Sequence, residues 1–225
     1  MGLSLALVIA AFALPPPLPP PAEFAPHVTN RWFPLPPGHY LVYRGTKDGQ
    51  PSSERFKVTR ETKTILGVDC TVVSDKLYLR GQLEERTEDW YAQDKAGNVW
   101  YLGEATAELY PNGSVKTREG SWQAGVDGAR AGIFMPARPH RGQSGIQELY
   151  KGEAEDHFRV LGFGAAVHTP AVSSEQTLVT REWTPLEPGV VDHKIYVMNF
   201  GTVLEETVKG GDELNELVAI GLRPR

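Results

Sequence analysis

The chain has 225 residues, of which 40% are hydrophobic and 23% are charged, and its formal net charge is −5. This length is sufficient to bury one core, and β sandwiches or barrels of this size often form one domain. The acidic balance and the lack of dense Lys/Arg runs argue against nucleic acid and anionic membranes as partners, because both require concentrated basic charge.

The chain opens with an apolar stretch, residues 3–14, that contains no charged side chain. The stretch is too short to cross a bilayer but suits the hydrophobic region of a signal peptide. Ala11-Phe12-Ala13 fits the small-residue pattern of a cleavage site, although no Lys or Arg precedes the stretch. Residues 1–13 are therefore predicted to be a signal peptide. The protein is expected to be secreted, or to lie in the periplasm or cell envelope, with no transmembrane segment.

A proline-rich segment follows at residues 14–29 and includes the run PPPLPPP at 15–21. Proline fixes φ and lacks an N–H group, so this run favours an extended polyproline II conformation. It is interpreted as a linker, with a docking motif as the alternative. One β domain is predicted over residues 30–225.

Short alternating apolar and polar stretches separated by turn residues dominate the rest of the chain, and this pattern is typical of strands. Lone Cys70 lies in such a stretch and is expected to be buried. Residues 152–161 and 212–219 have a short helix as their alternative. The chain is predicted to be all-β, with a mostly antiparallel sheet curved into a half-barrel or barrel-like shape. The strands are predicted at 40–45, 54–64, 71–79, 82–93, 98–103, 107–110, 114–122, 155–162, 176–184, 191–199, 202–209 and 213–221.

The strand pattern stops between residues 124 and 147, where glycine and proline are frequent. One long loop is predicted here, either a functional loop or a plain crossover between sheets. His140 lies within it as a candidate acid or base, or as a surface histidine without a role.

Three segments, WFPLPPGHYLVY at 32–43, DWYAQD at 89–94 with GNVWY at 97–101, and WTPLEPG at 183–189, resemble an uncharacterised family of exported bacterial β proteins. The resemblance covers nearly the whole chain after Asn30. It implies export and one β domain, and it implies no activity. A looser likeness to lipoprotein-carrier half-barrels depends on the strand-rich pattern and on Pro37-Gly38 followed by Tyr43.

The common catalytic and nucleotide-binding motifs are absent from the sequence. Glu155 and His157 share one face of a predicted strand, and His193 begins a later one. If the intervening strand carries Arg181 between them, these side chains lie in one row whose outer strands are roughly 10 Å apart. Strong curvature, or a further ligand from the loop, would bring them together around zinc or a similar divalent ion. The alternative is a solvated polar face. No other cofactor is expected.

Two further groups come from the predicted hairpin 82–103. Its acidic stretch 84–89 is interpreted as a solvated strand, since strand carboxylates on two faces do not form a calcium cage. Its aromatic residues pack against one another or line a groove that binds a ligand. The candidate ligand-binding residues are Trp90, Tyr91, Trp100 and Tyr101.

The sequence therefore favours an exported, non-catalytic binding protein that carries a small apolar or amphiphilic ligand in a concave sheet. The alternative is a metal-assisted hydrolase in which His157, His193 and Glu155 hold an ion that activates water. A structural component of the envelope is the third hypothesis.

Overall fold

The computed structural model describes residues 14–222, which form one strongly curved β structure. Within this range the only helix is a short 3-10 turn, η1 (Pro21–Glu23). The strands are β1 (Phe24–Ala25), β2 (His39–Lys47), β3 (Gln50–Ile65), β4 (Val68–Leu79), β5 (Gln82–Asp94), β6 (Val99–Leu109), β7 (Val115–Thr117), β8 (Trp122–Gln123), β9 (Arg130–Met135), β10 (Ser144–Ile146), β11 (Glu148–Leu149), β12 (His157–Phe163), β13 (Val167–His168), β14 (Ser173–Ser174), β15 (Thr177–Trp183), β16 (Val191–Val197), β17 (Gly201–Lys209) and β18 (Leu214–Leu222).

All pairings between these strands are antiparallel, and one 16-stranded sheet contains all of them except β13 and β14. Its main path runs β10-β12-β15-β16-β17-β18-β2-β3-β4-β5-β6-β9-β11. The two ends of this path, β10 and β11, are joined directly through Gln147. One short segment therefore pairs with β12 on one side and β9 on the other. This arrangement nearly closes the sheet into a barrel, which confirms the predicted all-β, barrel-like fold.

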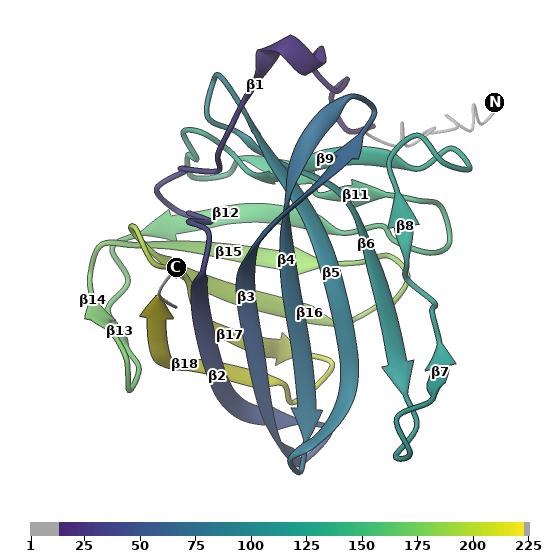
Figure 1. The fold of residues 1–225 in the computed structure, drawn as a ribbon. Helices are drawn as coiled ribbons and strands as arrows, with labels where there is room; N and C mark the ends of the chain where they lie inside the picture. Colours follow the sequence, from purple (N-terminus) through teal and green to yellow (C-terminus); the bar gives the residue numbers. More distant parts are fainter. Residues whose placement is uncertain (1–13, 223–225) are drawn as a thin grey trace, which may run out of the picture.

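The long strands β2 to β6 form one wall, and β12, β15, β16 and β17 cross behind them (Figure 1). The predicted pairing of 155–162 with 176–184, and of 176–184 with 191–199, is confirmed by β12, β15 and β16. Both segments with a helical alternative contain strands, β12 and β18. The strands predicted at 98–103 and 107–110 are the single strand β6.

The segment predicted as one long loop, 124–147, contains β9 and β10 and helps to close the sheet. Gly132 permits this closure, because a Cβ there would lie 2.2 Å from the carbonyl oxygen of Ile146. The short strands and frequent glycines hide the alternating pattern from a reading of the sequence. His140 remains in an exposed turn, where Nδ1 lies 3.4 Å from the carbonyl oxygen of Arg141.

The proline-rich segment lies against the β structure in the described residues. Leu18 packs on the main core, and β1 pairs with the end of β5. The Thr29 N–H donates to the Gln93 side chain at 2.8 Å. Contacts with the barrel therefore begin before the predicted domain start at Asn30. The predicted signal peptide, residues 1–13, lies outside the described residues.

The main core contains side chains from both faces of β5 and β6, such as Trp90 and Tyr91, and a second cluster includes Leu41, Tyr43 and Leu217. Cys70 is fully buried in the main core, as expected, and burial raises the pKa of its thiol to about 12. No helix within residues 14–222 is long and apolar enough to cross a bilayer.

Candidate functional site

A cavity of about 240 Å³ lies inside the barrel, between the front wall and the strands that cross behind it. Alternation along each strand sends every second side chain into this space. One end of the cavity is apolar, and Phe33, from the turn before β2, contacts the Phe134 ring at a centroid distance of 4.5 Å. The apolar lining comprises Phe33, Pro34, Leu35, Leu41, Phe56, Phe134 and Phe200.

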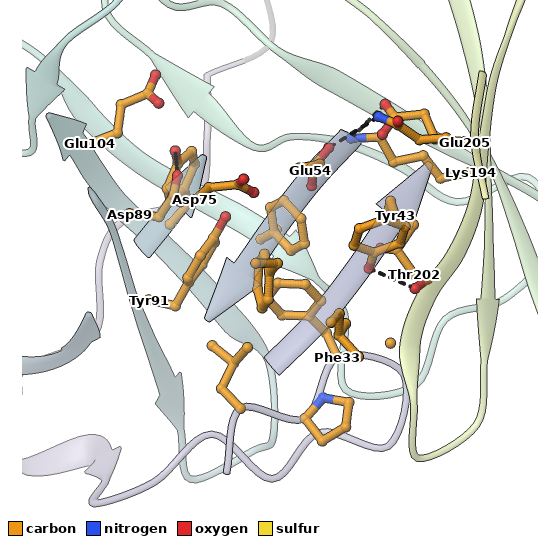
Figure 2. Close-up of a pocket in the computed structure, with 18 of the residues that line it drawn as sticks. Phe33, Tyr43, Glu54, Asp75, Asp89, Tyr91, Glu104, Lys194, Thr202 and Glu205 are labelled. Atoms are coloured by element: carbon orange, nitrogen blue, oxygen red, sulfur yellow. Dashed lines mark hydrogen bonds and ion pairs between the residues drawn. The ribbon is translucent and has the colours of Figure 1, made fainter. Parts of the chain in front are cut away.

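The other end of the cavity is acidic (Figure 2). A second hollow of about 270 Å³ continues from it toward the barrel rim, where Lys47 and Glu213 form an ion pair at 3.6 Å. The two hollows share five carboxyl side chains and Lys194. In the described part of the chain, seven carboxyl groups line the first cavity: Glu54, Asp75, Asp89, Glu104, Glu148, Asp156 and Glu205.

Asp89 joins the acidic wall to an aromatic pair. The Tyr101 hydroxyl donates to Asp89 Oδ1 at 2.6 Å, and the Tyr101 ring stacks on Tyr91 with centroids 4.7 Å apart. Burial, reinforced by the charge of Asp75, raises the pKa of Asp89 to about 7. The hydrogen bond from Tyr101 opposes this rise. Asp89 can therefore gain or lose a proton near neutral pH.

Glu54 and Asp75 form a second acidic pair, on β3 and β4. They share a hydrogen bond, and the pKa of Glu54 lies well above its usual range because of burial and the nearby charges of Asp75 and Glu205. Burial raises the pKa of Asp75 to about 6. Asn215 Nδ2 donates to Glu54 Oε2 at 3.0 Å. The pKa values of both carboxyl groups are therefore raised, and the pair takes up a proton more readily than exposed carboxyl groups do.

Lys194 is the one basic side chain that lines the first cavity in the described residues. Its Nζ lies 3.1 Å from Glu205 and 3.3 Å from Glu182. Burial lowers the pKa of Lys194, but these two carboxylates outweigh burial and raise it well above its usual range. Lys194 is therefore charged and already paired. It leaves most of the acidic wall without a counter-charge.

A β-bulge brings Glu104 into the cavity. Tyr91 pairs with Tyr101 and Asp89 with Glu104, so Leu102 and Gly103 together oppose the single residue Trp90. The extra residue turns both Tyr101 and Glu104 inward, although they are three positions apart. Burial and the charges of Asp89 and Glu85 raise the pKa of Glu104 well above its usual range.

Glu148 and Asp156 complete the acidic lining near the closing segment. Trp122 Nε1 donates to Glu148 Oε2 at 2.6 Å, and burial with the charge of Asp156 raises the pKa of Glu148 well above its usual range. Burial raises the pKa of Asp156 to about 6.

Of the four predicted ligand-binding residues, two line the cavity and two do not. Tyr91 and Tyr101 face inward. Trp90 and Trp100 alternate to the opposite face of their strands, where Lys63 Nζ lies 3.2 Å from the Trp90 ring centroid and Trp100 Nε1 donates to Asp94 at 2.8 Å. The tryptophans therefore pack on the outer side of the sheet.

The predicted metal residues do not converge. His193 pairs with Arg181 as expected, but the β12 residue in that row is Arg159. His157 pairs with Trp183 and stacks on its ring, and Glu155 accepts a hydrogen bond from Gly152 N–H at 2.7 Å. Within residues 14–222 no three His, Cys, Asp or Glu side chains are placed to hold a metal ion.

Sequence reasoning missed most of the acidic lining. The stretch 84–89 was expected to be solvated, but Asp89 is buried and faces inward. The available signal was its spacing of two residues from Tyr91, which places both side chains on one face of the strand. Glu54 and Phe56 give the same signal on β3, whereas Glu104 could not be placed without knowledge of the bulge.

No protein-family description and no curated protein matches this chain. Among solved structures, a predicted exported protein of Bacteroides fragilis with a YmcC-like fold is similar over 85% of this chain and 99% of its own, at 13% identity and a TM-score of 0.50. A predicted lipoprotein of Parabacteroides distasonis covers the same shares at 12% identity and a TM-score of 0.45. The first likeness shows that the chain shares a YmcC-like architecture, and it shows the fold alone.

Proposed function

We propose that this chain is an exported binding protein that carries a small amphiphilic ligand inside its barrel. The observation that carries the proposal is the interior cavity, which is apolar at one end and polar at the other. Binding sites for small molecules combine an apolar wall with a few placed polar groups in this way. The apolar stretch before the proline run and the fold shared with a predicted exported protein support export.

Two pairs of residues show how closely the apolar and polar regions adjoin. Leu41 pairs with Phe56, and two residues along the same strands Tyr43 pairs with Glu54. All four side chains line the cavity. Two residues along a strand span roughly 7 Å, so a short amphiphile reaches both regions at once.

The proposal is tested by filling the cavity. Thr202 lines it from β17, so Thr202→Phe places a ring in the ligand space. Val208, on the same strand and exposed, gives the matched control Val208→Phe. Octan-1-ol is titrated into each protein while methyl resonances are followed by NMR. We expect saturable shifts of the Leu41 methyl groups in the wild type and in Val208→Phe, and none in Thr202→Phe. Equal shifts in all three proteins would place octanol elsewhere and contradict the proposal.

A further inference from the structure

The interior charge of the barrel is strongly unbalanced. Seven carboxyl groups face the first cavity, and the one lysine there already contacts Glu205 and Glu182. A carboxylate in such a place needs a proton or a cation as its partner, because an unpaired buried charge is costly. An anionic ligand would add to the repulsion.

A bare metal ion does not fit this wall. Metal ligands must meet around one point at a separation of about 2.0–2.6 Å from the ion. Among the residues that the structure describes, no group of three carboxyl, imidazole or thiol side chains does so. The carboxyl groups are instead distributed over strands on both walls of the barrel. A cation that matches them must be larger and must carry its charge on a hydrogen-bond donor.

Two buried acceptors near the acidic pair have no donor. Asn215 is 3% exposed and lines the cavity, and its Oδ1 has no hydrogen-bond partner although its amide nitrogen bonds Glu54. The Ser52 hydroxyl, two residues before Glu54, is also buried without a partner. Gly45 on β2 pairs with Asn215 on β18 and with Ser52 on β3. Because glycine has no side chain, nothing on β2 separates the Asn215 and Ser52 side chains. Buried polar groups are rarely left unpaired, and such an exception points to a missing partner.

From this geometry we infer that the ligand is an organic cation, an amphiphilic amine whose ammonium group lies among Glu54, Asp75 and Asn215. An ammonium group donates three hydrogen bonds, which matches two carboxyl oxygens and the amide oxygen. Its hydrocarbon part extends along Phe56 and Leu41 toward Phe33. This inference depends on the proposed binding function and adds the chemical class of the ligand.

The test compares three probes that share one hydrocarbon tail and differ in the head group. Octylamine, octan-1-ol and sodium octanoate are titrated into the full-length exported protein by calorimetry at neutral pH. Octylamine is expected to bind at least tenfold more tightly than octanol, and octanoate most weakly. If octanol or octanoate binds as tightly as octylamine, the inference that the ligand is a cation is wrong, while the proposed binding function still holds. A failure of all three probes to bind overturns both proposals.

Variants then locate the head group. Asp75→Asn removes one carboxylate with little change of shape, and it is expected to weaken octylamine at least tenfold while changing octanol less than twofold. Glu88→Gln removes an exposed carboxylate on the outer face of β5 and is the matched control, with no change expected for either probe. An equal effect of the two substitutions on octylamine would mean that the protein's overall charge attracts the amine, and it would overturn the placement. If a variant fails to fold, the comparison of the three head groups in the wild-type protein still tests the inference.

Discussion

The Tyr101 hydroxyl donates a hydrogen bond to Asp89 Oδ1 at 2.6 Å, across the pairing of β6 with β5. This contact lies where the aromatic stack meets the acidic wall of the cavity. It stabilises the ionised form of a carboxyl group whose burial favours the protonated form. The protonation of Asp89 therefore depends on the opposing effects of burial and this hydrogen bond.

Removal of the Tyr101 hydroxyl group tests how this hydrogen bond and burial together set the pKa of Asp89. Tyr101→Phe is expected to raise the pKa of Asp89 further, because the lost bond favoured the carboxylate. The free energy of unfolding should fall by about 1 kcal/mol, a usual value for one lost hydrogen bond. Carbon-detected NMR titration of Asp89 and urea unfolding measure the two effects. Tyr110→Phe, at a half-exposed tyrosine, should change neither. An unchanged pKa of Asp89 would argue against the contact.

The stability of the free protein should fall as pH rises through the neutral range. The folded-state pKa values of Asp75 and Asp156 are about 6 and that of Asp89 about 7, above the unfolded value of about 4. Between these pH values the folded state therefore binds more protons than the unfolded state. The stabilisation that these three groups contribute is complete below about pH 4 and is lost as the pH rises to about 7. Together these three shifts correspond to a loss of about 5 kcal/mol from pH 5 to pH 8, which urea unfolding measures.

Two histidines change the stability in the opposite direction over part of this pH range. Burial lowers the pKa of His39 and His157, so their contribution is lost as pH falls below about 6.5. The comparison of variants separates the two effects. Asp89→Asn should flatten the pH profile, whereas Glu88→Gln, next to it and exposed, should leave the profile as it is. Equal slopes in both variants would exclude Asp89 as a source.

Lys194→Met leaves Glu182 and Glu205 without their shared cation. The loss of one partner from a buried ion pair typically costs about 3 kcal/mol, and water in the cavity reduces this value. The cost should be smaller at pH 5 than at pH 8, because burial raises the pKa of Glu205 and its protonated form no longer needs the lysine. Thermal unfolding at both pH values measures it. Addition of Glu205→Gln should recover part of the loss at pH 8, and a larger loss at pH 5 would contradict this account.

The bulge in β6 depends on Gly103. Its φ is +142°, and a Cβ there would lie 2.5 Å from the Trp122 carbonyl oxygen. Gly103→Ala is therefore expected to destabilise the fold by about 3 kcal/mol and to displace Glu104 from the cavity. Gly162→Ala is the matched control, because nothing lies within 4 Å of a Cβ at that position. Urea unfolding of the two variants should differ strongly, and similar stabilities would contradict the role of Gly103.

Alternation along the chain was sufficient to predict most of the sheet. In β2, β3 and β15 to β18 mainly one face is buried, and period-2 patterns report that face directly. The closing strands β9, β10 and β11 were missed because they are short and lie in or beside a glycine-rich segment, and their pairing depends on distant partners. The register of β12 differs from the expected one, and His157 therefore faces Trp183.

The acidic interior could be predicted only in part. Tyr91 and Tyr101 were identified as candidates from the predicted hairpin 82–103, in which aromatic residues meet across two strands, and both face the cavity. Asp89 was assigned to a solvated strand because the carboxyl groups of 84–89 are spread over two faces and do not form a calcium cage. Only the closure of the sheet turns these side chains inward together, and closure depends on contacts far apart in the sequence.

A crystal structure of the protein grown with octylamine tests the central claim most directly. We expect the amine nitrogen within hydrogen-bond distance of Glu54 or Asp75 and of Asn215 Oδ1, with the hydrocarbon tail against Phe56 and Leu41. A well-ordered crystal in which the cavity holds only water at saturating octylamine, or in which the head group points toward Phe33, would contradict the account.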